Sequence, residues 1–188
     1  MDYAVRRLTS GAGQPPNYHL LDQQDTVLIV ADQNVAPDAE ARRQVRLARP
    51  DGGLLATIEL PLADTSAGTS DYAIIHDYAV YAILSVHNRA TEDGSPAAPY
   101  FTLEVEGERW MALPDPQLDG CYALYDEVPR GLSPYGALAD LDLPPAIGRL
   151  CSVEGDYAYT ITFDEERLQQ PGVVVLALAY LVDRGQPS

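Results

Sequence analysis

The sequence has few basic residues and contains no lysine. Its twelve basic residues are all arginine and stand against 28 acidic residues, which gives the 188-residue chain a formal net charge of −16. A phosphate backbone or an anionic membrane surface would meet a repulsive field on such a protein. The composition therefore argues against nucleic acid as a partner and disfavours membrane association.

Cysteine and long apolar runs are also scarce. Cys121 and Cys151 are the only cysteines and form no CxxC motif, so we expect two reduced thiols, buried like small apolar side chains. The longest apolar run, Val173–Val182, has ten residues and is too short to cross a bilayer. Residues 1–15 contain no signal-like apolar segment, so we expect a flexible N-terminal segment and a cytoplasmic location.

The chain is rich in glycine and proline, and several of its segments alternate between apolar and polar residues. Its 14 Gly and 15 Pro indicate many turns between short elements. Residues 54–60, 101–106 and 157–163 alternate between apolar and polar side chains, the pattern of a strand with one buried face. Val27–Ala31 and Val80–Leu84 are apolar at both parities, which predicts strands covered on both faces.

Two hairpins can be named from the sequence. The first pairs Arg43–Arg49 with Leu54–Leu60 through the turn Pro50–Gly53, where glycine can adopt a positive φ. The second turns at Glu106–Glu108. Strands separated by such turns over most of the chain are typical of an all-β domain.

Proline predicts the loops, because it cannot donate to a sheet ladder. We expect loops at residues 95–99 and 114–116 and a long Pro-rich loop over residues 128–146. Its apolar side chains should either pack over one end of the domain or meet a partner. In the second case Tyr135 and Leu138 are the candidate partner-binding residues. The apolar side chains are Leu132, Tyr135, Leu138, Leu141 and Leu143.

The C-terminal run Val173–Val182 fits either a strand or a helix. Its valines favour a strand, whereas Pro171 suits the first turn of a helix, Glu165 and Glu166 lie near its positive end, and Arg184 lies near its last turn. A helix that is apolar on every side belongs in a core.

These patterns predict one mostly β domain over residues 1–188: a closed antiparallel β-barrel with a buried C-terminal α-helix. In the alternative, Val173–Val182 is the closing strand of a hollow barrel that binds a small ligand.

Three stretches resemble the tubby-like superfamily, which includes the LURP-one-related proteins and the phospholipid scramblases. They are Tyr18–Asp32, Gln44–Leu60 and Gly155–Asp183. The resemblance implies a strand pair, a hairpin with an Asp-Gly turn, and a last strand leading into an apolar helix that threads a twelve-stranded barrel. It also implies recognition of a membrane lipid or a protein. The chain lacks the family's cysteine-rich palmitoylation segment and its scramblase-type calcium site, and its basic cluster is only partial.

That basic cluster places four arginines within eight residues. Arginine can bind a phosphate or lipid head group with two parallel hydrogen bonds. The alternative is a solvated outer strand face with a few surface ion pairs. The candidate anion-binding residues are Arg42, Arg43, Arg46 and Arg49.

Candidate catalytic and metal-binding groups are few. His76, Asp77 and His87, with Ser85, could form a hydrolase site at the barrel rim, but no G-x-S-x-G motif supports it. No metal-ligand or P-loop spacing occurs among the histidines, acids and glycines, so we expect no metal and no cofactor. The groups considered as metal ligands are the three histidines with Asp22, Asp77, Asp115, Asp119, Asp140 and Asp142.

We therefore expect a non-enzymatic binding or scaffold domain, a monomer or a weak homo-oligomer, that recognises a protein, a small ligand or a lipid head group. The alternative is a small hydrolase or a small-ligand-binding barrel that uses rim residues around His76, Asp77 and His87.

Overall fold

A computed structural model describes eight segments of the chain, and the structural statements below refer to these: residues 2–8, 16–34, 44–59, 69–90, 94–126, 143–153, 158–163 and 170–185.

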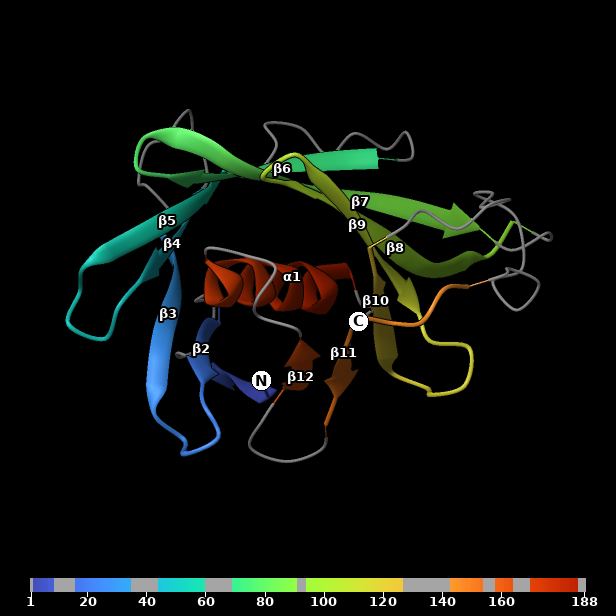
Figure 1. The fold of residues 1–188 in the computed structure, drawn as a ribbon, viewed down its shortest axis with the longest axis horizontal. Helices are drawn as coiled ribbons and strands as arrows, with labels where there is room; N and C mark the ends of the chain where they lie inside the picture. Colours follow the sequence, from blue (N-terminus) through green and yellow to red (C-terminus); the bar gives the residue numbers. More distant parts are fainter. Residues whose placement is uncertain are drawn as a thin grey trace.

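The described residues form a closed antiparallel barrel of twelve strands around one helix (Figure 1). The predicted fold class is confirmed. The strands are β1 (Asp2–Leu8), β2 (Asn17–Leu21), β3 (Val27–Asn34), β4 (Gln44–Ala48), β5 (Leu54–Glu59), β6 (Thr69–His76), β7 (Ala79–Ala90), β8 (Pro96–Val105), β9 (Glu108–Pro114), β10 (Cys121–Tyr125), β11 (Gly148–Ser152) and β12 (Tyr159–Phe163), and the helix is α1 (Pro171–Gly185).

Strand β1 closes the barrel between β2 and β12. Val5 lies opposite Leu20 on β2 and Tyr159 on β12. The side chains of Tyr3 and Val5 are buried in the core. The expectation of a flexible segment over residues 1–15 was therefore wrong for residues 2–8, because their alternating apolar side chains complete the inner wall; residues 9–15 lie outside the described part.

Tight turns join the strand pairs at one end of the barrel. Both predicted hairpins are confirmed: Gly52 has φ +88° between β4 and β5, and Gly107 has φ +85° between β8 and β9. The β6–β7 turn contains no glycine and places Asp77 and Tyr78 at φ 47° and 64°. These turns surround the mouth at which α1 begins, which we call the entry mouth; α1 ends at the exit mouth (Figure 1).

Helix α1 fills the barrel along its axis. Each side chain of Val173–Val182 is at most 4% exposed, as the helical interpretation predicted, and Pro171 is the first helical residue. Gly172 lies so close to the wall that a Cβ there would be 3.0 Å from Ile29 and 3.1 Å from Leu20.

One gap among the described residues, beside Phe101, Trp110 and Leu178, is apolar and has a volume of about 20 Å³. It has room for about one water molecule and not for a ligand. The hollow-barrel alternative was therefore wrong. No helix in the described part of the chain has the length and apolarity needed to cross a membrane.

Two local expectations were also wrong. Val80 and Ile83 on β7 are 59% and 38% exposed, because only the inner face of a single-layered barrel meets the helix. Residues 96–99, expected as a loop, belong to β8. Pro96 is tolerated as the first residue of the strand, and Pro99 falls where the β7–β8 register shifts.

A second apolar cluster lies on the outer wall. Leu143 packs there against Met111, Leu113, Ala123 and Tyr125 of β9 and β10. This end of the predicted Pro-rich loop therefore covers the side of the barrel rather than its mouth. The candidate partner-binding residues in the middle of that loop, Tyr135 and Leu138, lie outside the described residues.

Candidate functional site

A groove of about 600 Å³ opens at the entry mouth, between the start of β7 and the β8–β9 hairpin. We call it the hairpin groove and define it by Val80–Ile83 and Glu104–Arg109, which line it. The two segments are adjacent because β8 pairs with both β7 and β9. The sequence does not predict this groove, because the meeting of outward side chains from neighbouring strands depends on the strand register.

Tyr81 links the groove to the central helix. The β6–β7 register shifts so that Ile74 lies opposite Ala82 and Ile75 opposite Val80, which leaves Tyr81 as the extra residue of a bulge. Its hydroxyl accepts the backbone N–H of Gln170, the residue before α1, at 3.1 Å. Burial and the nearby negative charge of Glu106 raise the pKa of Tyr81 to about 12, against the opposing effect of the Gln170 N–H.

The charged groups that line the groove are three glutamates and one arginine. Glu108 accepts a hydrogen bond from the indole N–H of buried Trp110 at 3.1 Å. Arg109 lies 3.8 Å from Glu104, with both side chains more than half exposed. Because Trp110 is an uncharged donor, it holds Glu108 in place without neutralising it.

His76 and Asp77 lie beside the groove, as the rim hypothesis expected. The Nδ1–H of His76 donates to the carbonyl of Leu55 at 2.6 Å, which fixes the ring orientation. Its Nε2 lies 3.5 Å from the Asp77 carboxylate, and its ring meets Tyr81 edge-on, with the centroids 5.9 Å apart.

His87 belongs to a different part of the molecule. It lies eight residues beyond Ala79, the cross-strand partner of His76, which corresponds to roughly 26 Å of strand. Its Nε2 is 2.9 Å from the hydroxyl of Thr102 and its Nδ1 is 3.3 Å from the hydroxyl of Thr69.

The His87 ring also stacks on Tyr100, with the centroids 4.4 Å apart. Burial, with the charge of Arg109, lowers the pKa of His87. The structure therefore does not bring His76, Asp77 and His87 together as one catalytic site. Within the described residues, no three His, Cys, Asp or Glu side chains form a group that could hold a metal ion.

The arginine cluster is described only in part. Arg42 and Arg43 lie outside the described residues. Arg46, on β4, donates from Nη2 to the carbonyl of Gly52 at 2.7 Å and so supports the β4–β5 turn. Arg49 is exposed in that turn.

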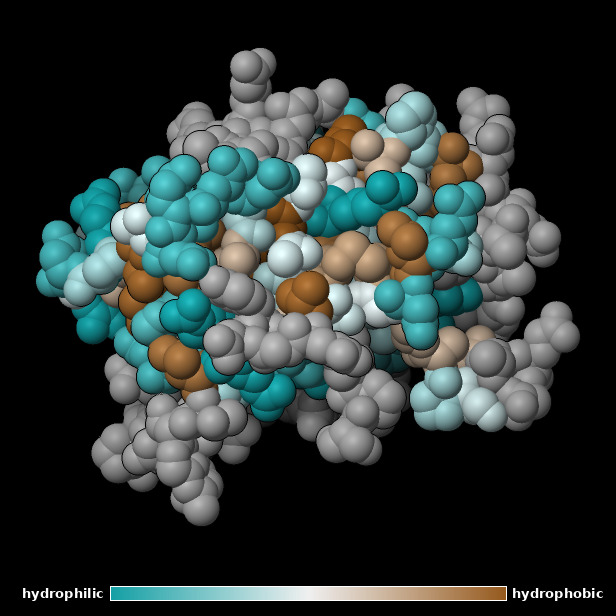
Figure 2. All heavy atoms as spheres, turned by 90° about the horizontal axis from the view of Figure 1, so that it is seen from below, coloured by the Kyte–Doolittle hydropathy of each residue, from teal (hydrophilic) through white to brown (hydrophobic). Residues whose placement is uncertain are grey.

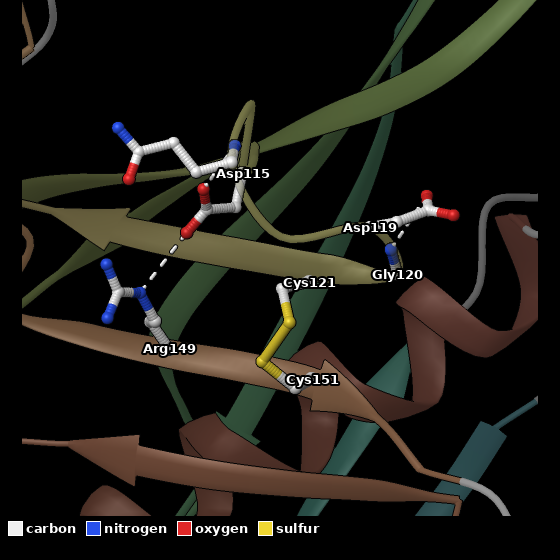
Figure 3. The surroundings of a disulfide bond; sticks show 7 residues. Asp115, Asp119, Gly120, Cys121, Arg149 and Cys151 are labelled. Atoms are coloured by element: carbon white, nitrogen blue, oxygen red, sulfur yellow. Dashed lines mark hydrogen bonds and ion pairs between the residues drawn. A yellow bond between two sulfur atoms is a disulfide. The ribbon is translucent and has the colours of Figure 1, made fainter.

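The two cysteines form a disulfide, contrary to the expectation of free thiols (Figure 3). Cys121 and Cys151 are directly opposite on β10 and β11, with their Cα atoms 4.1 Å apart. In the neighbouring residue pair, the backbone N–H of Ser152 donates to the carbonyl of Gly120. Cys121 and Cys151 therefore form a non-hydrogen-bonded pair, in which opposite side chains come closest. A 30-residue spacing in the sequence cannot reveal this register.

A polar network at the exit mouth was also missed. The Asp183 carboxylate accepts the hydroxyls of Tyr18 at 2.5 Å and Tyr159 at 3.3 Å and lies 3.5 Å from Arg7. Burial and this carboxylate raise the pKa of both tyrosines well above the usual value. An aspartate directly after an apolar helical run was the available signal, because a negative charge at a helix C-terminus needs partners.

Another shallow groove, of about 320 Å³, lies between β1, β12 and the β2–β3 turn. Its Asp22 carboxylate accepts the backbone N–H groups of Gln24 and Thr26 and so shapes the turn. Figure 2 shows the side of the barrel around β2, β11 and β12, where apolar residues lie in separate spots among polar ones.

No family model matches the chain, and a comparison with curated proteins finds no match either.

Proposed function

We propose that this protein is a non-enzymatic binding domain that recognises a protein partner on the outside of its barrel. The observation that carries this proposal is the filled interior: Val173–Val182 are at most 4% exposed inside the barrel and the apolar gap beside Leu178 measures only about 20 Å³, so we expect a ligand to bind to the surface. The hairpin groove offers the volume, the exposed apolar side chains and the fixed polar groups that such recognition needs.

We further propose that the chain is a tubby-like protein. The twelve-stranded barrel and its buried C-terminal helix agree with the architecture that the resemblance implies. A shared architecture supports function only weakly, because one fold hosts many functions. Lipid recognition is the less favoured version here, since the net charge is −16 and Arg46 is engaged by the backbone.

We also propose that this protein is located in the cytoplasm, and the redox state of its two cysteines is the property that tests this. A disulfide such as Cys121–Cys151 is more typical of oxidising compartments. Thiol labelling of the protein in its native cells, before lysis, tests the location: labelled cysteines support a reducing compartment, and unlabelled cysteines that react only after reduction contradict it.

A screen of short peptides and small fragments by two-dimensional amide NMR tests the proposed function. We expect shifts that cluster on the outer wall and the entry mouth, including Val80–Ile83, with unchanged signals from the interior of α1 around Leu178. Specific shifts along α1, or turnover of an ester or amide in the screen, would contradict a non-enzymatic surface binder.

A further inference from the structure

We propose that the hairpin groove binds a basic, apolar segment of a partner protein, in which positively charged side chains alternate with aliphatic ones. This inference rests on the proposed binding function and names the chemistry of its partner.

Exposed apolar side chains concentrate at this groove. Tyr78 at the tip of the β6–β7 turn is fully exposed, and Val80 and Ile83 are 59% and 38% exposed. They fall within six consecutive residues, whereas the other large apolar side chains that are exposed in the described segments lie far apart in the sequence: Leu8, Leu54, Leu118 and Val153. An apolar segment of a partner would remove Val80 and Ile83 from water.

The charges of the groove select a cationic partner. The groove is lined by three glutamates, Glu104, Glu106 and Glu108, and by one arginine, Arg109, which lies beside Glu104. Glu108 is held by the neutral donor Trp110, so it needs no rearrangement to receive a positive charge. At the neighbouring turn the side chain of Asp77 is 91% exposed and adds a further negative charge.

Other occupants fit less well. A second copy of this chain would bring a net charge of −16 against the same charge, and its groove would oppose glutamates with glutamates. An anionic membrane would be repelled by the same three carboxylates. A basic segment is attracted by the net negative charge of the protein and by the carboxylates of the groove. The first speeds association, and the second fixes the position of the segment in the groove.

Isothermal titration calorimetry with an eight-residue capped peptide of alternating arginine and leucine tests the proposal. We compare the wild type with Glu104→Gln/Glu106→Gln/Glu108→Gln and with Val80→Ser/Ile83→Ser, after circular dichroism confirms that each variant folds. Each groove variant should bind the peptide about tenfold more weakly than the wild type.

Matched controls separate the groove from general attraction to an acidic protein. Asp2→Asn/Asp71→Asn/Asp119→Asn removes three exposed charges elsewhere, and Leu118→Ser/Val153→Ser removes two exposed apolar side chains elsewhere. Both controls should bind within about twofold of the wild type. Equal losses in groove and control variants, or no binding by the wild type, would overturn the proposal.

Two further outcomes also overturn it. A peptide with glutamate in place of arginine that binds equally well would refute the basic partner while leaving surface recognition intact. A concentration-dependent dimer that Ile83→Ser abolishes would show that a second copy occupies the groove. If instead the NMR screen finds perturbation only inside the barrel, the proposed function itself fails.

Discussion

At the scale of single residues, polar groups inside an apolar barrel decide how the helix is held. In the last turn of α1 the Asp183 carboxylate has three partners, from β1, β2 and β12, and the Tyr81 hydroxyl binds the backbone N–H just before the helix begins. Sequence patterns could place Tyr18 and Tyr159 on strands, but they could not show that both hydroxyls converge on one carboxylate. That convergence depends on barrel closure, which brings together residues more than 150 positions apart.

Buried tyrosine should make the protein sensitive to alkaline pH. Burial raises the pKa of Tyr122 to about 12, whereas tyrosine in the unfolded chain titrates near 10. The folded state therefore keeps a proton that the unfolded state loses, so its stability is intact below pH 10 and falls between pH 10 and 12.

The variant Tyr122→Phe isolates this contribution. Between pH 10 and 12 its free energy of unfolding should fall less steeply than that of the wild type, by up to about 1.4 kcal/mol per pH unit. Urea denaturation at several pH values measures the difference. Parallel pH dependence of the two proteins would show that Tyr122 titrates normally in the folded state.

At the scale of elements, local signals predicted what depends on local sequence. The Asp-Gly and Glu-Gly turns fixed two hairpins, and Pro171 with ten apolar residues indicated a buried helix. Strand β1 was missed because one of its two partner strands, β12, lies at the far end of the chain. The bulge at Tyr81 was missed because register shifts depend on both paired strands.

Replacing a residue at the centre of α1 tests the role of that helix. Leu178→Asp should prevent folding, since an unpaired buried carboxylate costs several kcal/mol, comparable to the whole stability of such a domain. Circular dichroism and thermal denaturation measure it. Leu118→Asp, at a side chain 45% exposed, should leave the melting temperature nearly unchanged. A soluble Leu178→Asp protein with the wild-type melting temperature would refute the buried position.

The disulfide should stabilise the pairing of β10 and β11. It closes a loop of 30 residues, for which loop-closure entropy gives about 3–4 kcal/mol. Cys151→Ser should lower the free energy of unfolding by this order, measured by chemical denaturation without reductant. With reductant, the wild type and the variant should unfold alike. Equal stability of both proteins without reductant would indicate that the bond contributes nothing in solution.

At the scale of the whole molecule, the net charge of −16 should outweigh the local arginine cluster. Each arginine near an anionic surface gains about 1 kcal/mol at most, while the rest of the protein is repelled. We expect no co-sedimentation with anionic vesicles at about 0.15 M salt. Strong pelleting that is lost when Arg42, Arg43, Arg46 and Arg49 are replaced by glutamine would contradict this.

The candidate site was harder to predict than the barrel. His76 and Asp77 were placed correctly at a rim, but their separation from His87 and the hairpin groove itself depend on how β7, β8 and β9 align. Alternation along a strand indicates which face is buried. It does not indicate which outward side chains of neighbouring strands meet.

Binding on the outer surface requires that α1 stays inside the barrel, and amide hydrogen exchange of Val173–Val182 tests this directly. We predict that these amides exchange only through global unfolding, with a free energy of opening equal to the free energy of unfolding. Exchange of α1 through a much smaller opening energy than that of β7 and β8 would show that the helix leaves the lumen, and that a ligand could bind where α1 now lies.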